Sequence, residues 1–85
     1  MSAEGTRGRV RQVIDEHARL PVGADTLSDD ADLFAAGMTS HASVSLMLAL
    51  EDAFDLEFPD QMLKRSVFES IGSISVAIDE LEGGS

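Results

Sequence analysis

The chain has 85 residues, enough for one small domain but too few to bury two separate cores. Hydrophobic residues make up 44% of it, which argues against disorder despite a net charge of −10. Cysteine is absent, so the protein has neither disulfides nor a thiol of its own. The charge disfavours nucleic acid and anionic membranes, and no apolar run is long enough to span a bilayer. Because no apolar signal-peptide core is present either, we expect a cytoplasmic monomer.

Charge is divided unevenly along the sequence. Residues 1–19 hold four arginines against three carboxylates, a sum of +1. Residues 20–85 hold only Lys64 and Arg65 against thirteen carboxylates, a sum of −11. A surface this acidic is expected to attract basic partners.

The first predicted helix runs from Thr6 to about Leu20, after a frayed segment of residues 1–5. Pro21 sets its end, because proline disfavours helical geometry in the residue before it. The spacing i, i+3, i+4 and i+7 predicts an inward face that consists of Val10, Val13, Ile14 and His17. We expect His17 to be a partly buried packing residue, neither a ligand nor a base.

Residues 21–39 form a long connection, and loops of this length in compact domains tend to be functional. Glycine, serine and aspartate residues predict turns, while four apolar residues are expected to anchor the loop: Val22, Leu27, Leu33 and Phe34. The aspartates of this loop lack the spacing, the central glycine and the final glutamate of a calcium-binding EF-hand. We therefore expect no metal here.

A second helix is predicted from Ser40 to Asp55. At about 100° per residue, its core face consists of Leu46, Leu50, Ala53 and Phe54, with Met47 at the edge. The opposite side carries an outer stripe of His41, Val44 and Leu48, beside Ser45 and Asp52. Two interpretations of this stripe stay open: it binds a partner protein, which so short a chain favours, or another segment covers it.

The remaining sequence predicts two more helices. The segment Phe58-Pro59-Asp60 begins a short third helix that reaches Lys64 or Arg65, after which Val67 and Phe68 turn inward. Ser70 caps a last helix, which Gly83 and Gly84 stop and whose apolar face consists of Ile71, Ile74, Ile78 and Leu81. We therefore predict an all-α fold, a small four-helix bundle with three main helices, a short third one, and a long loop between helices one and two.

The segment Gly37-Met38-Thr39-Ser40-His41 joins this loop to the second helix. A helix that begins at Ser40 leaves a hydroxyl exposed at its N-terminus. Free backbone N–H groups and the positive end of the helix dipole favour a phosphate at that place. Ser40 is therefore our candidate site for the attachment of a phosphate-containing group.

Several motifs, in order, resemble the acyl carrier protein family, which includes the peptidyl carrier domains. The strongest is the run from Asp32 to Ser40, with an acidic residue, a hydrophobic pair, a glycine and then the serine that the family modifies. Further matches follow at the family's spacing: Ala49-Leu50-Glu51-Asp52-Ala53-Phe54, Phe58-Pro59-Asp60 and Phe68-Glu69-Ser70-Ile71. The resemblance covers nearly the whole chain, so we expect residues 1–85 to be a single carrier domain, ordered over about residues 6–82.

The resemblance implies that a phosphopantetheinyl transferase moves 4′-phosphopantetheine from coenzyme A onto Ser40. The terminal thiol of this arm then holds an acyl or aminoacyl group as a thioester, which the carrier presents to a downstream acceptor enzyme. Thr39 and His41 flank the attached phosphate as cofactor-binding residues. The expected partner surface consists of Val44, Leu48, Glu51 and Asp52.

Departures from the family pattern point to unusual partners. The family usually has aspartate before the serine and an aliphatic residue after it, where this chain has Thr39 and His41. Members that act in fatty-acid synthesis tend to carry carboxylates early in this helix, where this chain has Ala42, Ser43 and Ser45. We therefore expect a stand-alone carrier that a dedicated ligase loads, with an amino acid as one candidate for the cargo.

Two other interpretations use the same serine. As an enzyme, the chain would use Ser40 as a nucleophile with His41 or His17 as base. Adjacent helical residues point about 100° apart, however, and the glycine that follows the serine in a nucleophile elbow is missing. As an unmodified interaction module, the chain would bind a partner helix through the outer stripe, and Ser40 would only cap its helix. We expect no catalytic residue and keep the interaction module as the alternative.

Overall fold

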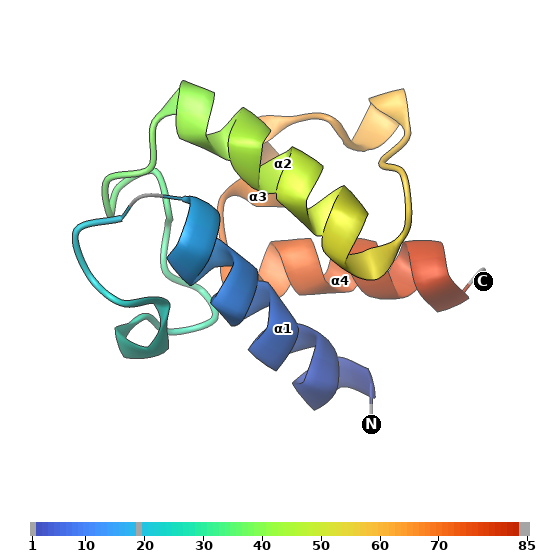
Figure 1. Cartoon of the computed structure of the whole chain (residues 1–85), viewed down its shortest axis with the longest axis horizontal. Coiled ribbons are helices and arrows are strands. Elements are labelled where there is room, and N and C mark those ends of the chain that lie inside the picture. Colours follow the sequence, from blue (N-terminus) through green and yellow to red (C-terminus); the bar gives the residue numbers. More distant parts are fainter. Residues whose placement is uncertain (1, 19, 84–85) are drawn as a thin grey trace.

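The computed structural model describes residues 2–18 and 20–83, with side chains from residue 5 onward. Its helical elements, with η marking 3-10 turns, are α1 (Ser2–His17), η1 (Ala24–Thr26), α2 (Ser40–Phe54), η2 (Asp60–Met62), α3 (Arg65–Phe68) and α4 (Ile71–Gly83) (Figure 1). No strand occurs among these residues. The predicted all-α bundle with a short third helix and a long loop between the first two helices is confirmed.

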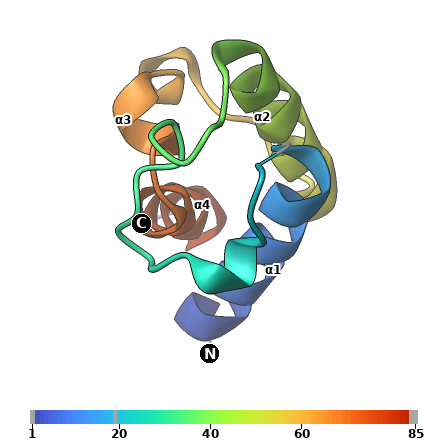
Figure 2. The same ribbon diagram turned by 90° about the vertical axis from the view of Figure 1, so that its left-hand side faces the viewer.

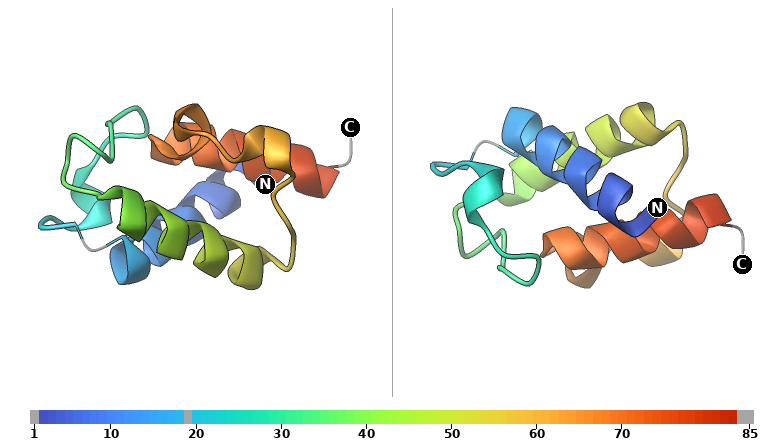
Figure 3. Two further views of the ribbon diagram at one scale, coloured as in Figure 1. Left: turned by 90° about the horizontal axis from the view of Figure 1, so that it is seen from above. Right: turned by 90° about the horizontal axis from the view of Figure 1, so that it is seen from below.

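The three long helices surround a common core. α1 packs against both α2 and α4, and α3 packs on α4. Seen from the loop end, α4 is viewed end-on with the other helices around it, and the loop crosses in front (Figure 2). From above, α2 lies in front, and from below, α1 does (Figure 3). Within the described chain, no helix combines the length and the apolar character that crossing a membrane requires.

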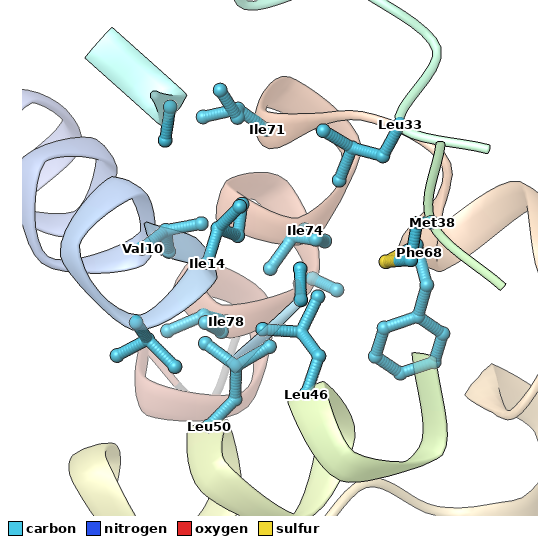
Figure 4. Close-up of a cluster of buried hydrophobic side chains, with 14 of the residues drawn as sticks. Val10, Ile14, Leu33, Met38, Leu46, Leu50, Phe68, Ile71, Ile74 and Ile78 are labelled. Atoms are coloured by element: carbon cyan, nitrogen blue, oxygen red, sulfur yellow. The ribbon is translucent and has the colours of Figure 1, made fainter. Parts of the chain in front are cut away.

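The core is built from the helix faces that the periodicity predicts. Its fully buried large side chains come from the long helices and from the loop: Val10, Ile14, Leu33, Leu46, Leu50, Ile71, Ile74 and Ile78 (Figure 4). Burial of each such side chain contributes about 1.5–3 kcal/mol of transfer free energy. Ala53, Phe54 and Leu81, also predicted to face inward, are partly buried against this cluster.

α1 differs from the prediction at both ends and in one residue of its face. It begins at Ser2 instead of Thr6, so most of the segment predicted to fray is helical, and it ends at His17 instead of Leu20. The prediction that His17 packs inward is wrong, because its side chain is 46% exposed. The helix ends there, and the fully buried Ala18 closes the face in its place.

The long loop is anchored by fewer of the predicted residues than expected. Leu33 is fully buried, as predicted, and Leu27 and Phe34 pack partly buried against the core. The prediction for Val22 is wrong, since this residue is 46% exposed. The chain bends as it leaves α1, and Ala24, in the 3-10 turn η1, enters the core instead.

Two arginines of α1 hold the loop against the bundle. Arg11 donates hydrogen bonds from Nη1 to the carbonyl oxygens of Ala24 and Leu27, each at 2.7 Å, and from Nη2 to Asp29 Oδ1 at 2.6 Å. Arg7 Nε lies 3.3 Å from Asp29 Oδ2. The loop is therefore fixed by polar contacts to α1 as well as by its buried side chains.

The short third helix lies later in the chain than predicted. The 3-10 turn η2 follows Pro59, Lys64 is extended (φ −143°, ψ 159°), and only then does α3 begin at Arg65. The extended residue redirects the chain so that Phe68 is buried, with its ring centroid 5.2 Å from that of Phe58 in an edge-to-face arrangement. The prediction of one continuous helix from Phe58 to Lys64 or Arg65 is therefore wrong.

The start of α4 is capped and lies tightly against the loop. Ser70 Oγ accepts a hydrogen bond from the N–H of Ser73, as the predicted cap requires, and Ser73 Oγ accepts one from the N–H of Ser70. The N–H of Gly72 donates to the carbonyl of Asp29 at 2.9 Å, and a Cβ at Gly72 would lie only 3.2 Å from that oxygen. α4 reaches Gly83, the last described residue, so the prediction that Gly83 and Gly84 stop it stays a prediction.

Candidate functional site

The segment before Ser40 is a hydrogen-bonded turn. Asp32 Oδ1 accepts hydrogen bonds from the N–H groups of Phe34 at 2.9 Å and of Ala35 at 3.3 Å. The N–H of Met38 donates to the carbonyl of Leu33 at 2.9 Å. Because the side chains of Leu33 and Met38 are both buried, the core fixes the position of this turn directly before the helix.

Gly37 is required at its position for two reasons. Its φ of +126° lies in a region that side chains with a Cβ rarely adopt. A Cβ at Gly37 would also lie 2.9 Å from Cδ of Pro21. The glycine therefore lets the chain turn toward α2 while passing close to the exit from α1.

Thr39, not Ser40, caps α2. Its backbone is extended (φ −86°, ψ 166°), and its Oγ1 accepts a hydrogen bond from the N–H of Ala42 at 3.0 Å. The idea that Ser40 only caps the helix is therefore wrong. Sequence reasoning could not decide between these neighbours, because serine and threonine are both good N-cap residues.

Ser40 is the first residue of α2, and it is exposed. Its Oγ makes no hydrogen bond with any residue that the structure describes. The N–H groups of Ser40 and His41 have no acceptor within the helix, because both lie in its first turn. That turn contains no carboxylate, so nothing within it offsets the positive end of the dipole. The hydroxyl is accessible at a position that favours a phosphate.

A groove of about 240 Å³ opens beside Ser40, between α2 and the segment that leads into α3. Val44 and Met47 line it from α2, while Leu63, before α3, and Phe68, at the end of α3, line it from the other side. Its lining is mainly apolar, and sequence reasoning missed it because its two sides lie far apart along the chain.

Two cations, Lys64 and Arg65, also line this groove. The Cζ atom of Arg65 lies 4.0 Å from the ring centroid of Phe34, in a cation–π contact. A signal for this position was present in the sequence, since these two residues are the only cations after residue 19.

The outer stripe of α2 is exposed in this structure. Val44 and Leu48 are 54% and 55% exposed, so neither is covered by another described segment of the chain. His41 and Asp52 are exposed as well. Glu51 is partly buried, and its Oε2 accepts a hydrogen bond from the N–H of Phe58 at 2.9 Å. Glu51 therefore fixes the chain after α2, which leaves Val44, Leu48 and Asp52 as the accessible members of the expected surface.

The enzyme interpretation requires a base beside Ser40, and a metal site requires a cluster of ligating side chains. In the part of the chain that the structure describes, Ser40 Oγ has no hydrogen bond to His17 or His41. No cluster of three or more potential metal-ligating side chains occurs among those residues. What the site presents is one accessible hydroxyl beside an apolar groove.

Comparison with known proteins identifies this kind of site. A family model described as the phosphopantetheine attachment site matches residues 9–78. The chain belongs to the acyl carrier protein family. A curated relative, the aminoacyl carrier protein of Agrobacterium fabrum (strain C58 / ATCC 33970), is 51% identical over 65 residues, which are 76% of this carrier protein and 78% of the relative.

Solved structures agree with the fold of this carrier protein. One is an engineered Bradyrhizobium japonicum glycine:[carrier protein] ligase in complex with a carrier protein from Agrobacterium tumefaciens and ATP. The matched chain is 44% identical with a TM-score of 0.85, and the alignment covers 87% of our chain and 96% of the matched one. The other is a Bradyrhizobium japonicum glycine:[carrier protein] ligase in complex with glycylated carrier protein. Here the matched chain is 25% identical with a TM-score of 0.74, and the coverage is 86% and 97%.

The residues of this carrier protein fit a phosphopantetheine group. Ser40 offers an exposed hydroxyl, the start of α2 offers unpaired N–H groups, and the adjoining groove is mainly apolar with two cations. The departure from the family pattern at Thr39 preserves the helix start, because threonine takes over the N-cap role that aspartate can also fill. Compared with the family pattern, threonine at this position leaves out a negative charge next to Ser40.

Proposed function

We propose that this carrier protein holds an aminoacyl group on a 4′-phosphopantetheine arm attached to Ser40 and presents it to partner enzymes. The observation that carries the proposal is the accessible hydroxyl of Ser40, without a hydrogen bond to any described residue, at the start of α2 in a chain that matches the attachment-site family. When bound, the arm supplies a terminal thiol that carries acyl groups as thioesters, and this cysteine-free chain has no thiol of its own.

Around Ser40 the chain contributes positioning. Gly37 and Thr39 set the backbone before the helix, and the N–H groups of Ser40 and His41 would hold the phosphate. The side chain of His41 is exposed next to this position. A phosphopantetheinyl transferase would accept the hydroxyl proton while Oγ bonds to the phosphorus of the phosphopantetheine, and the pyrophosphate bond of coenzyme A would break to release adenosine 3′,5′-bisphosphate. Ser40 therefore needs no base from this chain.

A ligase that loads an amino acid is the proposed source of the cargo, and a downstream acceptor enzyme would receive it. Support comes from the relative named as an aminoacyl carrier protein and from the carriers crystallised with glycine:[carrier protein] ligases. The uncharged first turn of α2 also supports partners other than those of fatty-acid synthesis. The chain performs no catalytic step in this proposal.

Mass spectrometry tests the attachment of the arm and then, in a second step, its loading with an amino acid. Incubation with coenzyme A and a broad-specificity phosphopantetheinyl transferase should add the mass of one phosphopantetheine to the intact protein. Subsequent incubation with glycine, ATP and the engineered Bradyrhizobium japonicum ligase should add one glycyl group. If no tested transferase adds mass in the first step, the carrier proposal is wrong. If only the second step fails to add mass, glycine loading by this ligase is wrong and the carrier proposal stands.

We also propose that Val44 and Leu48 contact the partner enzymes. A change of either residue to aspartate should lower the rate of loading about tenfold or more, because a charge would be buried against an apolar partner surface. Circular dichroism should show unchanged helicity, because both side chains are more than half exposed.

Val76→Asp is a matched control, since Val76 is an exposed valine (57%) on α4 and does not line the groove beside Ser40. It should load at the wild-type rate. If Val44→Asp or Leu48→Asp unfolds the domain, or if Val76→Asp slows loading equally, the proposed contact surface is wrong.

The second candidate function is an unmodified helical interaction module. The exposed outer stripe of α2 favours it, because such a stripe also suits a partner helix. The two functions differ in the first mass measurement: the module predicts partner binding without any gain in mass.

A further inference from the structure

We propose that the side of the carrier protein around Ser40 docks a ligase surface that is apolar at its centre and carries carboxylates opposite Lys64. This inference rests on the proposed function and adds the chemistry of the partner's docking surface. It reverses the expectation of basic partners that follows from the net charge of −10. We call this side the α2–α3 face and define it by Val44, Leu48, Leu63, Lys64 and Arg65.

Large exposed hydrophobic side chains gather on the α2–α3 face. Among the described residues, the exposed large hydrophobic ones are Val22, Val44, Leu48, Leu63 and Val76, and three of these five belong to the face. Val44 and Leu63 line the groove beside Ser40, and Leu48 follows Val44 one helical turn later. Isolated exposed apolar residues are ordinary, but two that line one groove, with a third one helical turn away, mark a binding surface.

The same face holds all the positive side-chain charge of residues 20–85. Lys64 and Arg65 are the only cations in this range, and both line the groove. The guanidinium group of Arg65 already makes a cation–π contact with the ring of Phe34. Lys64 is exposed and makes no ion pair with any described residue, so its ammonium group is available to a partner's carboxylate.

No carboxylate of the described residues forms an ion pair with Lys64 or Arg65. Neither α2 nor α3 has an acidic residue in its first turn, and no carboxylate lines the groove. Glu51 is bonded to the backbone of Phe58, and Asp29 is paired with the arginines of α1. Asp60 and Glu69 lie four residues from Lys64 and Arg65, respectively, and neither makes an ion pair with them. A carboxylate of the partner at the groove therefore meets an ammonium group at Lys64 that no described residue pairs with.

The experiment measures binding of the phosphopantetheinylated carrier to the engineered Bradyrhizobium japonicum ligase by calorimetry. Lys64→Gln removes one positive charge from the face. Gln12→Glu changes the net charge equally but on an exposed position of α1, so it is the matched control. Lys64→Arg keeps the charge and is the rescue variant. Intact mass and the thermal midpoint are recorded for each protein before binding is measured.

We expect Lys64→Gln to raise the Kd about threefold to tenfold, while Gln12→Glu and Lys64→Arg stay within about twofold of the wild type. Added salt should weaken binding of the wild type more than that of Lys64→Gln. Equal effects of Lys64→Gln and Gln12→Glu, tighter binding of Lys64→Gln, or no binding of the wild type to the ligase would overturn the inference. Loss of the phosphopantetheine mass gain would instead overturn the proposed function, so the two failures are distinguishable.

Discussion

Replacement of Ser40 by alanine should abolish the phosphopantetheine mass gain completely. The proposed bond forms at Oγ, and this is the atom that the substitution removes. Folding should be unaffected within about 0.5 kcal/mol, because Ser40 is exposed, its hydroxyl bonds to no described residue, and the cap of α2 is Thr39. Intact-mass spectrometry and a urea denaturation curve check the two parts of this prediction.

Ser43→Ala is the matched control for that experiment. Ser43 lies less than one helical turn after Ser40, lines the same groove, and donates from Oγ to the carbonyl of Ser40 at 2.6 Å. If the transferase simply modified any hydroxyl near the start of α2, Ser43→Ala would reduce the mass gain and Ser40→Ala would retain part of it. We expect the opposite, with full modification of Ser43→Ala and none of Ser40→Ala.

Helix faces were predictable because burial repeats with the period of the helix. Each long helix has one inward face that its apolar spacing predicts. Fully buried residues on these faces are Ile14 in α1, Leu46 and Leu50 in α2, and Ile78 in α4. The approximate location of Ser40 at a helix start was equally predictable, since hydroxyl residues directly before a periodic apolar run are a helix-start signal.

The errors arose where neighbouring residues had similar local preferences. Thr39 and Ser40 are both good caps, and only the backbone geometry of the turn selects Thr39. Nothing local distinguishes Val22 from an anchoring residue either, because which of Val22 and Ala24 enters the core depends on the bend after α1. The groove could not be predicted from the sequence for a related reason. It depends on tertiary packing, in which Phe68 lies against Phe58 and Lys64 lies near α2.

Leu33→Ala should cause the largest loss of stability among the loop variants. Leu33 is fully buried, between Ile71 and Met38 in the core (Figure 4), and its carbonyl accepts the hydrogen bond that closes the turn before α2. Removing its side chain leaves a cavity and should lower the free energy of unfolding by about 2–5 kcal/mol. For a small domain this is a large share of the total, so the urea midpoint should fall by about 1 M or more.

Val22→Ala is the control variant with which the stability loss of Leu33→Ala is compared. From sequence alone, Val22 and Leu33 were equivalent anchors of one loop, yet only Leu33 is buried. Val22→Ala should therefore change the free energy of unfolding by less than about 0.5 kcal/mol. Similar losses in both variants would mean that Val22 is buried in solution and that the loop is seated differently. A large loss for Leu33→Ala alone means that the fixed loop, and with it the turn before Ser40, depends on this buried side chain.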